Sequence, residues 1–499
     1  MDKIQVYKNN EVYLKIVCEK YLAKELSEYF TFFVPGYRFT PAFKNKTWDG
    51  KIRLFSLQNF QLYIGLLPYL EQFCQERGYE LEHILPYANV TDDFPMYYAK
   101  KFVEELRVQS RGKDIEVRDY QLEAFVNGMR NRRQLLLSPT ASGKSLIIYL
   151  FVRQFLQYQK LRGLIIVPTT SLVEQLYSDF EDYSTANGWD VEENVHRIYQ
   201  GKDKQSDKNL VISTWQSLYN LPAEYFEQFD FVIGDEAHLF KAQSLSFIMT
   251  SLINTKYRIG LTGTLDGTAT HKLVLEGLFG TVKKVTTTKE LIDKGQLSDF
   301  EIKCLVLKHP DETCQELKKV KYPKEVEYLI FNEQRNKFIR NLALSLEGNS
   351  LILYQYVDKH GKILYNMILE AEKLGNKKVY FIHGKVDTDI REDIRKIMET
   401  ENNAIVVASY GTFSTGINIR NLHNIVFASP SKSRIRNLQS IGRGLRQSET
   451  KSKAVLYDIA DDLRTKDYVN FTLKHFTERI KIYNEERFPY KIYKIGLKK

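Results

Sequence analysis

QLLLSPTASGKS, from Gln134 to Ser145, is the stretch that decides the fold of this chain. Its leucines predict a short buried strand, and Gly143-Lys144-Ser145 predicts the start of a helix that continues as an apolar run. A tight loop between a strand and a helix can bind phosphates, because backbone N–H groups and the helix dipole point at the anion. In that arrangement Lys144 reaches the β- and γ-phosphates, and the Ser145 hydroxyl holds Mg²⁺.

One position of this loop departs from the general phosphate-loop pattern. The pattern has glycine where Ser138 stands, so the loop relies on Ser142-Gly143 for a close approach of its backbone. The alternative is an ordinary loop with a solvated lysine. The residues predicted to bind the nucleotide are Thr140, Ser142, Gly143, Lys144 and Ser145.

The composition is that of a globular protein with a polyanionic partner. The chain has 499 residues, enough for about two to four domains, and a net charge of +10. No apolar run reaches the ~18 residues of a membrane span, and the first residues lack the apolar segment of a secretory signal. The four cysteines are scattered without a Cys-x-x-Cys pair, which argues against a disulfide framework or a zinc site and favours a reducing compartment.

Residues 1–112 predict a small α+β unit. Within it, residues 37–55 interleave basic and aromatic side chains around Asp49-Gly50, a dipeptide typical of hairpin turns. A basic, aromatic hairpin is a suitable nucleic-acid contact. The alternative is a strand pair with an aromatic core face and a solvated basic face. The candidate contacts are Arg38, Trp48 and Lys51.

From about residue 114 strands and helices alternate, which is the signature of a parallel sheet with crossover helices. Hydroxyl residues follow two predicted strands, at the carboxyl ends where ligands bind in open α/β sheets. These residues are Thr169, Thr170 and Thr214. Ahead of the phosphate loop, Gln121 lies at a helix start. Its amide matches adenine N6 and N7, the alternative being a solvated glutamine.

The predicted strand 229–234 ends in Asp235-Glu236-Ala237-His238. Two adjacent carboxylates at a strand end suit two tasks: Asp235 holds Mg²⁺, and Glu236 orients and activates the attacking water. The next strand runs into Thr262-Gly263-Thr264. A hydrogen bond from His238 to these hydroxyls would link the nucleotide site to neighbouring loops; the alternative is a surface histidine that caps a helix.

A second series of strands and helices begins at residue 300 and has no phosphate loop of its own. It carries QSIGRGLR, residues 439–446, in which Arg443 and Arg446 share one face of a helix. Facing a γ-phosphate, they would act as arginine fingers; the alternative is a basic helix face on nucleic acid. After residue 465 the chain turns basic and predicts one helix, about 468–487, and a short extended end.

The order of these motifs resembles the motor core of superfamily-two helicases and translocases. The resemblance covers residues 115–460 and supports the phosphate, Mg²⁺, water-activating and finger roles given above. Thr262-Gly263-Thr264 stands where many relatives have Ser-Ala-Thr. The further roles that it implies are nucleotide contacts for Gln121 and Gly416, coupling for His238, Thr262, Thr264 and Gln439, and nucleic-acid contact for Thr169, Thr170, Thr214 and Thr415.

A closer resemblance runs through the whole chain. Gly36-Tyr37-Arg38-Phe39, the segment WDGKIRL at 48–54, and the segments 167–170 and 411–417 are similar to the phage UvsW-type DNA helicases. That family implies ATP-driven remodelling of branched DNA, namely Holliday junctions, stalled forks and R-loops, in recombination, repair and replication. It also implies a small DNA-binding domain ahead of two RecA-like domains.

We therefore expect an α/β protein with two tandem RecA-like parallel-sheet domains and a small α+β N-terminal domain. The predicted boundaries are 1–112 for the DNA-binding domain, 113–290 for the first RecA-like domain with the ATP site, 291–465 for the second with the arginine fingers, and 466–499 for a basic helix and tail. The expected ligands are ATP and Mg²⁺. The expected partner is branched or forked DNA, with RNA in R-loops, and we expect a monomer in the cytoplasm (the host's, if the chain is phage-encoded).

Two other functions stay open at this point. The same core serves RNA helicases, and phosphate contacts do not separate RNA from DNA unless a 2′-hydroxyl is read. A nucleic-acid binding module with a vestigial nucleotide fold is the non-enzymatic alternative, which the intact Lys144, Asp235, Glu236, Arg443 and Arg446 disfavour.

Overall fold

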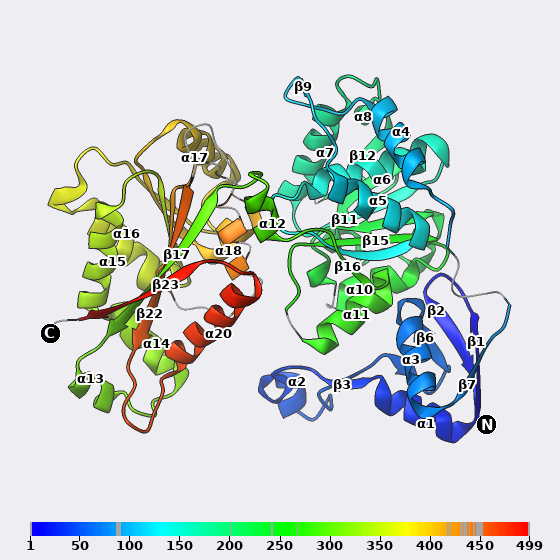
Figure 1. Cartoon of the computed structure of the whole chain (residues 1–499), viewed down its shortest axis with the longest axis horizontal. Helices are drawn as coiled ribbons and strands as arrows, with labels where there is room; N and C mark the ends of the chain where they lie inside the picture. The colour runs from blue at the N-terminus through cyan, green and yellow to red at the C-terminus, as the bar shows by residue number, and fades with distance from the viewer. Residues whose placement is uncertain are drawn as a thin grey trace. The chain divides into compact units, whose positions relative to one another are not determined.

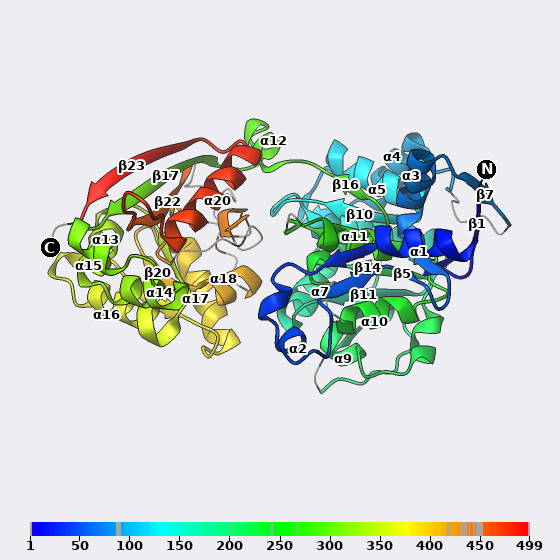
Figure 2. The same ribbon diagram turned by 90° about the horizontal axis from the view of Figure 1, so that it is seen from below.

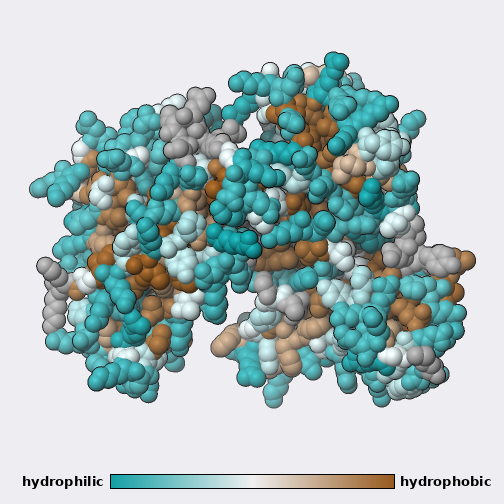
Figure 3. All heavy atoms as spheres, viewed as in Figure 1, coloured by the Kyte–Doolittle hydropathy of each residue, from teal (hydrophilic) through white to brown (hydrophobic). Residues whose placement is uncertain are grey.

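The computed structural model describes residues 2–85, 91–199, 201–240, 243–266, 268–416, 419, 421–429, 433, 437–438, 440–442, 445 and 453–497. The chain forms two compact units (Figure 1). The first unit holds Met1–Ser138 and Gly143–Val285, and the second holds Pro139–Ser142 and Thr286–Lys499. Polar residues cover most of the face seen in Figure 3, with apolar atoms showing between them. In the described part of the chain, every helix is too short or too polar to cross a membrane.

The N-terminal part of the first unit contains a five-stranded mixed sheet with the order β5-β6-β2-β1-β7. Its strands are β1 (Lys3–Lys8), β2 (Tyr13–Val17), β5 (Phe55–Ser56), β6 (Gln61–Tyr63) and β7 (Glu80–His83). Its helices are α1 (Lys20–Tyr29), the turn η2 (Ile64–Leu66) and α3 (Leu67–Arg77). The buried residues of these helices join the same core as those of the strands.

A second antiparallel pair, β3 (Thr31–Phe33) with β4 (Lys51–Arg53), lies outside this sheet. We call residues 31–53 the arm. The strands of the predicted hairpin pair as β3 and β4, but Asp49-Gly50 is not a tight turn between them, because the residues before it form η1 (Tyr37–Phe39) and the short helix α2 (Pro41–Lys44). Thr40 caps α2 by accepting the Phe43 N–H at 3.3 Å, and a proline at the first helical position favours a helix and cannot donate to a strand ladder.

The rest of the first unit is built on a seven-stranded parallel sheet with the order β12-β13-β11-β14-β15-β10-β16. The strands are β10 (Arg133–Leu137), β11 (Gly163–Val167), β12 (Val195–Ile198), β13 (Leu210–Thr214), β14 (Phe231–Gly234), β15 (Tyr257–Thr262) and β16 (Val282–Lys284). The helices and turns are α4 (Met96–Leu106), α5 (Asp119–Asn131), α6 (Lys144–Tyr158), α7 (Thr170–Ser184), α8 (Val191–Asn194), α9 (Trp215–Leu218), η3 (Ala223–Gln228), η4 (Ala237–Leu239), α10 (Gln243–Ser251) and α11 (Ala269–Phe279), with the small pair β8 (Gln109–Ser110) and β9 (Lys113–Asp114).

Both faces of this sheet are buried, as expected for parallel strands with crossover helices. One core contains apolar residues of α4, α5, α6 and α7 together with one side of the strands. The other contains residues of α10 and α11 and is continuous with the core of the N-terminal sheet. The N-terminal part therefore shares a hydrophobic core with the sheet that carries the phosphate loop.

The second unit contains a second seven-stranded parallel sheet, with the order β19-β20-β18-β21-β22-β17-β23. The strands are β17 (Asp299–Lys308), β18 (Ser350–Tyr354), β19 (Val379–Ile382), β20 (Ile405–Ser409), β21 (Asn424–Phe427), β22 (Lys453–Asp462) and β23 (Tyr490–Gly496). The helices and turns are α12 (Thr288–Asp293), α13 (Asp311–Glu316), α14 (Tyr322–Phe331), α15 (Glu333–Ser345), η5 (Val357–Gly361), α16 (Lys362–Leu369), η6 (Glu372–Leu374), α17 (Thr388–Thr400), α18 (Tyr410–Gly416) and α20 (Phe471–Glu485). The predicted α/β fold with two parallel sheets is confirmed.

The helix predicted at about 468–487 and the extended end after it are present as α20 and β23, and both belong to the second unit. Strand β23 pairs in parallel with β17 and forms one edge of the sheet (Figure 2). Arg479 of α20 is 1% exposed and donates to both carboxylate oxygens of Asp458 on β22, at 2.7 and 2.8 Å. Arg479, one of the basic residues of this segment, is therefore neutralised inside the core.

Candidate active site

The predicted nucleotide site lies at the carboxyl ends of the strands in the first parallel sheet. Strands β14, β15 and β10 are adjacent in the sheet. In their register, Leu137 of β10 pairs with Thr262 of β15, and Gly234 of β14 pairs with Gly260 of β15. The phosphate loop, the Asp235-Glu236 pair and Thr262-Gly263-Thr264 therefore leave the sheet at the same end, where open α/β sheets bind ligands.

The phosphate loop bends through two residues in the left-handed backbone region, Ala141 (φ 68°) and Gly143 (φ 81°). Ser138, which replaces the expected glycine, is fully buried and its N–H donates to Thr262 O at 2.8 Å. The glycine at 143 has a packing reason as well, since a Cβ there would lie 2.3 Å from Gln121 Nε2. Helix α6 begins directly afterwards at Lys144, so its N-terminus faces the phosphate position.

Gln121 lies beside the loop, as its predicted role requires, but its amide has a structural partner. Its side chain is 3% exposed, and Oε1 accepts the backbone N–H of Arg118 at 3.0 Å as part of a capping box at the start of α5. Adenine recognition by this amide stays a prediction.

Lys144 and the two carboxylates form a compact charged cluster. Lys144 Nζ lies 3.8 Å from Glu236 Oε1, and the Glu236 N–H donates to Asp235 Oδ1 at 2.9 Å. Glu236 itself has the left-handed backbone angles φ 50° and ψ 48°. That conformation costs roughly 1–3 kcal/mol for a residue with a side chain, and such strain is typical of functional positions.

The electrostatics of this cluster fit a divalent cation and a triphosphate. Burial and the charge of Glu236 raise the pKa of Asp235 to about 6, while Lys144 opposes the shift. A cation beside Asp235 relieves the repulsion between the carboxylates, and a phosphate beside Lys144 compensates its charge. Among the described residues, no cluster of three His, Cys, Asp or Glu side chains could hold a metal by itself. Nucleotide sites bind Mg²⁺ through one or two protein ligands together with phosphates and water, and Asp235 and Ser145 are the residues predicted to supply them.

The predicted link between His238 and the next strand is present. His238 Nδ1 lies 3.0 Å from Thr262 Oγ1, and the same ring nitrogen is 3.3 Å from Glu236 Oε2. Thr262 Oγ1 in turn donates to Thr264 O at 3.0 Å. His238 is 6% exposed, so the alternative of a surface capping histidine is wrong.

Two side chains at this site carried no sequence signal. Tyr183 of α7 places its hydroxyl 3.0 Å from Ser145 Oγ, the predicted Mg²⁺ ligand. His271 of α11 places Nε2 2.8 Å from the backbone carbonyl of His238 and Nδ1 2.9 Å from Asp266 Oδ1. Tyr183 comes from the helix that follows β11 and His271 from the helix that follows β15, so only the packing of these helices brings the two side chains to the site.

The hydroxyl residues predicted to contact nucleic acid differ in how accessible they are. Thr170 is exposed. Thr169 is half-buried and caps α7, accepting the Leu172 N–H at 3.4 Å. Thr214 is 5% exposed and its hydroxyl lies 3.0 Å from Ser217 Oγ. Only Thr170 offers its side chain openly to a partner, because the other two hydroxyls serve local turns.

The three predicted contacts in the arm also differ. Arg38 is exposed, and its Nε donates to Tyr37 OH at 3.1 Å. Lys51 places Nζ 5.0 Å from the ring centre of Phe33. Trp48 is half-buried, and its indole N–H donates to Lys51 O at 2.9 Å. Trp48 thus stabilises the arm from within, whereas the two cations remain available to phosphates.

The remaining predicted residues belong to the second unit. Arg443, Arg446 and Gln439 lie outside the described residues. Thr415 and Gly416 end helix α18 and follow β20, while their side-chain surroundings are also outside the described part. Their roles stay predictions.

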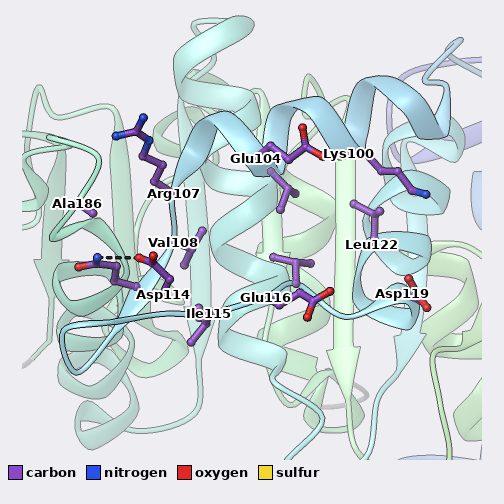
Figure 4. A pocket seen from close by; sticks show the side chains of 13 residues that line it. Lys100, Glu104, Arg107, Val108, Asp114, Ile115, Glu116, Asp119, Leu122 and Ala186 are labelled. Atoms are coloured by element: carbon purple, nitrogen blue, oxygen red, sulfur yellow. Dashed lines mark hydrogen bonds between the residues drawn. The ribbon is translucent and has the colours of Figure 1, made fainter.

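A cavity of about 670 Å³ lies elsewhere in the first unit, between α4, the loop before α5 and the end of β9 (Figure 4). Its lining mixes cations such as Lys100 and Arg107 with Glu104, Glu116 and Asp119. None of the residues predicted to act on nucleotide or nucleic acid lines it, so it is separate from the phosphate loop.

Three family models match the chain in succession. They are described as DNA helicase UvsW, N-terminal (residues 3–83), type III restriction enzyme, res subunit (114–267), and helicase conserved C-terminal domain (333–448).

Similar proteins and structures cover the whole chain. The ATP-dependent DNA helicase uvsW of Enterobacteria phage T4 is 35% identical, covering 99% of this chain and 100% of the relative. The DNA 3'-5' translocase XPB2 of Sulfurisphaera tokodaii is 25% identical, covering 69% and 81%. The crystal structure of T4 UvsW matches 99% of this chain and 100% of its own, with 33% identity and a TM-score of 0.52.

Proposed function

The chain belongs to the UvsW family of DNA helicases, and on that premise we propose that this ATP-dependent DNA helicase remodels branched DNA. Its substrates would be Holliday junctions, stalled forks and R-loops, in recombination, repair and replication. The observation that carries the proposal is the full-length match, which includes the N-terminal domain and not the motor core alone. We propose further that it works as a monomer in the cytoplasm, the host's if the chain is phage-encoded.

The residues of the first unit divide the hydrolysis of ATP between them. Lys144 binds the terminal phosphates, since its ammonium group stands at the N-terminus of α6. Glu236 accepts the proton of the attacking water and orients that water through its other oxygen. Mg²⁺, held by Asp235 and Ser145, would supply charge neutralisation to the phosphates when bound. Tyr183 fixes the rotamer of Ser145 through their hydrogen bond.

The remaining roles in the proposal concern coupling and the second unit. His238 and Thr262 connect Glu236 to the end of β15, so a change at the γ-phosphate reaches the neighbouring loop. Arg443 and Arg446 are proposed as arginine fingers, which stabilise the charge that develops during phosphoryl transfer. Gln439 is proposed to couple, Gly416 to contact the nucleotide, and Thr415 to contact DNA.

The first experiment measures the steady-state ATPase rate without nucleic acid and with single-stranded DNA, a four-way DNA junction or structured RNA. We expect the junction to stimulate most. Strongest stimulation by RNA would overturn the choice of substrate while leaving the ATP site in place. Equal stimulation by single-stranded DNA and the junction would contradict the preference for branches.

Two variants assign the measured activity to this site. Lys144→Ala should reduce the ATPase rate on the order of 10²-fold or more by removing the phosphate contact. Glu236→Gln should reduce it by roughly 10²–10⁴-fold by removing the general base. Lys101→Ala, in an exposed lysine of α4, is the matched control and should leave the rate unchanged. Full activity of Glu236→Gln would show that another group activates the water.

A further inference from the structure

The arm combines an internal scaffold of aromatic rings with one phenylalanine, Phe39, that is 82% exposed among the described residues. Phe33 and Tyr37 stack with centroids 4.8 Å apart, and Tyr37 meets Phe43 edge-on at 4.7 Å. Gly50 has φ 81°, and a Cβ there would lie 2.2 Å from the Tyr37 ring, so that ring rests directly on the backbone. The scaffold, the α2 cap and the Trp48 hydrogen bond together fix the shape of the arm.

Phe39 is the exception within this scaffold. It ends the turn η1 and is 82% exposed, whereas Phe33 is 52% exposed. No ring contact of Phe39 occurs among the described residues. In the view of Figure 3, apolar atoms show at the place of α2 and β3. A single exposed ring is common on protein surfaces, but Phe39 and Phe33 lie on one arm whose shape is already fixed, and this places an open aromatic face among the cations of the arm.

The charges around Phe39 indicate what kind of partner this face fits. Arg38 is its sequence neighbour, and Lys44 and Lys46 follow it on α2 and just beyond. All three side chains are exposed. The carboxylate within the arm, Asp49, forms an ion pair with Arg53 and is thereby neutralised. An aromatic face framed by cations complements a base framed by phosphates, because bases stack on rings while phosphates bind lysine and arginine.

A ring of this kind can stack only on a base whose face is uncovered. In a continuous duplex each base is covered above and below by its neighbours, and only its edges reach the grooves. At the branch point of a fork, where the two strands separate, bases lie unpaired with one face uncovered. We propose that the arm stacks Phe39 on an unpaired base at the branch point of DNA, and so distinguishes branched from linear DNA. This inference rests on the proposed function and adds to it the element that reads the branch.

The experiment compares binding by the full-length chain to two DNAs of equal length. One is a fork with unpaired nucleotides at its branch point, and the other is a fully paired linear duplex. The affinity ratio of fork to duplex is obtained by fluorescence anisotropy. Phe39→Ala should lower this ratio roughly tenfold, the size of one lost base–aromatic stack. Phe39→Trp should retain the ratio, and its added indole fluorescence should be quenched by the fork.

Two further variants distinguish stacking on a base from an apolar wedge and from general surface contact. Phe39→Leu keeps an apolar side chain without an aromatic face, so it should lose the preference as alanine does; full retention would mean an apolar wedge and overturn the stacking. Tyr97→Ala removes an equally open ring, 75% exposed on α4, and should leave the ratio unchanged. A loss of the same size for Tyr97→Ala would reduce the effect to general surface contact and overturn the assignment.

The result also separates this inference from the proposed function. An unchanged ratio for Phe39→Ala, or equal losses on fork and duplex, would overturn the role of the arm alone. A wild-type chain whose ATPase no DNA stimulates would instead overturn the proposed function. A probe base such as 2-aminopurine at the branch point should change its fluorescence on binding the wild-type chain but not Phe39→Ala.

Discussion

Thr262 ends β15 and His238 lies in η4, just after β14, and their side chains meet because β15 and β14 are neighbours in the first sheet. Thr262 is fully buried, and its hydroxyl lies between His238 Nδ1 and the carbonyl of Thr264. Thr264 differs, since its own hydroxyl is buried with no hydrogen-bond partner among the described residues. At the scale of single residues, the connection between β14 and β15 therefore runs through the Thr262 side chain.

Replacing Thr262 with valine removes this connection and nearly preserves the volume of the side chain. We expect the DNA-stimulated ATPase rate of Thr262→Val to stay within a few-fold of the wild type, because Lys144 and Glu236 are untouched. The number of base pairs unwound per ATP should fall roughly tenfold, because the hydrogen bond that links the two strand ends is lost. Parallel ATPase and strand-separation assays measure both quantities.

The resemblance implies a coupling role for Thr264 as well, but its hydroxyl has no hydrogen-bond partner in the described part of the chain, so Thr264→Val is the matched control. It should unwind as many base pairs per ATP as the wild type. If Thr262→Val behaves in the same way as Thr264→Val, the hydrogen bond to His238 has no part in coupling.

At the scale of elements, the π-helical turn η5 brings a histidine into the core of the second unit. His360 is fully buried, with Nδ1 3.1 Å from Ser429 Oγ and Nε2 3.2 Å from Asn336 Oδ1. Burial, and then the charge of Arg335, lowers the pKa of His360 to about 3. The second unit therefore folds around a neutral imidazole.

This burial makes the stability of the second unit depend on pH. In the unfolded chain His360 binds a proton below about pH 6.5, whereas in the folded chain it does so only near pH 3. The stability that it contributes is thus present above pH 6.5 and is lost as the pH falls toward 3. The expected loss is about 1.4 kcal/mol per pH unit, or about 2 kcal/mol at pH 5. Urea unfolding of the second unit at pH 7.5 and pH 5 measures it.

His360→Asn should remove this part of the pH dependence, although it lowers stability at both pH values. His196→Gln, in a half-buried histidine of the first unit, is the control and should leave the pH dependence of the second unit unchanged. An equal loss of stability between pH 7.5 and pH 5 in wild type and His360→Asn would contradict the assignment.

At the scale of the whole molecule, the N-terminal part packs tightly against the parallel sheet and helix α11 of the first unit. Tyr69 of α3 donates its hydroxyl to Glu276 of α11 at 2.6 Å. Arg133, at the start of β10, donates to the Glu11 carboxylate at 2.7 Å. Gly65 in η2 lies against α11, and a Cβ there would be 1.8 Å from the Glu276 carbonyl oxygen. Helix α11 also carries His271, so one helix contacts both the ATP site and the N-terminal part.

Gly65→Ala should weaken the packing of the N-terminal part against α11, because the added methyl group meets a backbone atom that has no freedom to move aside. We expect a loss of about 1–3 kcal/mol, as for other overpacked sites. Hydrogen–deuterium exchange in β6 and α11 should show faster exchange in the variant, and urea unfolding of the first unit gives the free energy.

Gly384→Ala is the matched control, since no heavy atom lies within 4 Å of a Cβ built there. It should leave exchange in β6 and α11 unchanged. Unchanged exchange in Gly65→Ala would mean that the N-terminal part moves independently of α11.

Much of the fold could be predicted from local chemistry. The apolar run at 350–354 coincides with β18, and the apolar run at 164–167 lies within β11. Both are continuous apolar runs, because parallel strands are buried on two faces. The phosphate loop and the Asp235-Glu236 pair could also be predicted, since short segments of sequence carry their chemistry. The turn predicted in the arm failed because other local signals outweighed it: the Thr40 cap and Pro41 favoured a helix over a strand.

The amino-acid sequence by itself thus determined the fold class, the order of the motifs and the chemistry of the ATP site, because each depends on residues close together in the chain. The tertiary structure decided which distant side chains meet. Tyr183 reaches Ser145, and His271 reaches His238, through the packing of helices that the strand order sets. In the basic C-terminal segment, Arg479 pairs with Asp458 in the core, and β23 joins the second sheet. Such contacts depend on which strands are neighbours, and the local patterns of a single sequence do not fix that order.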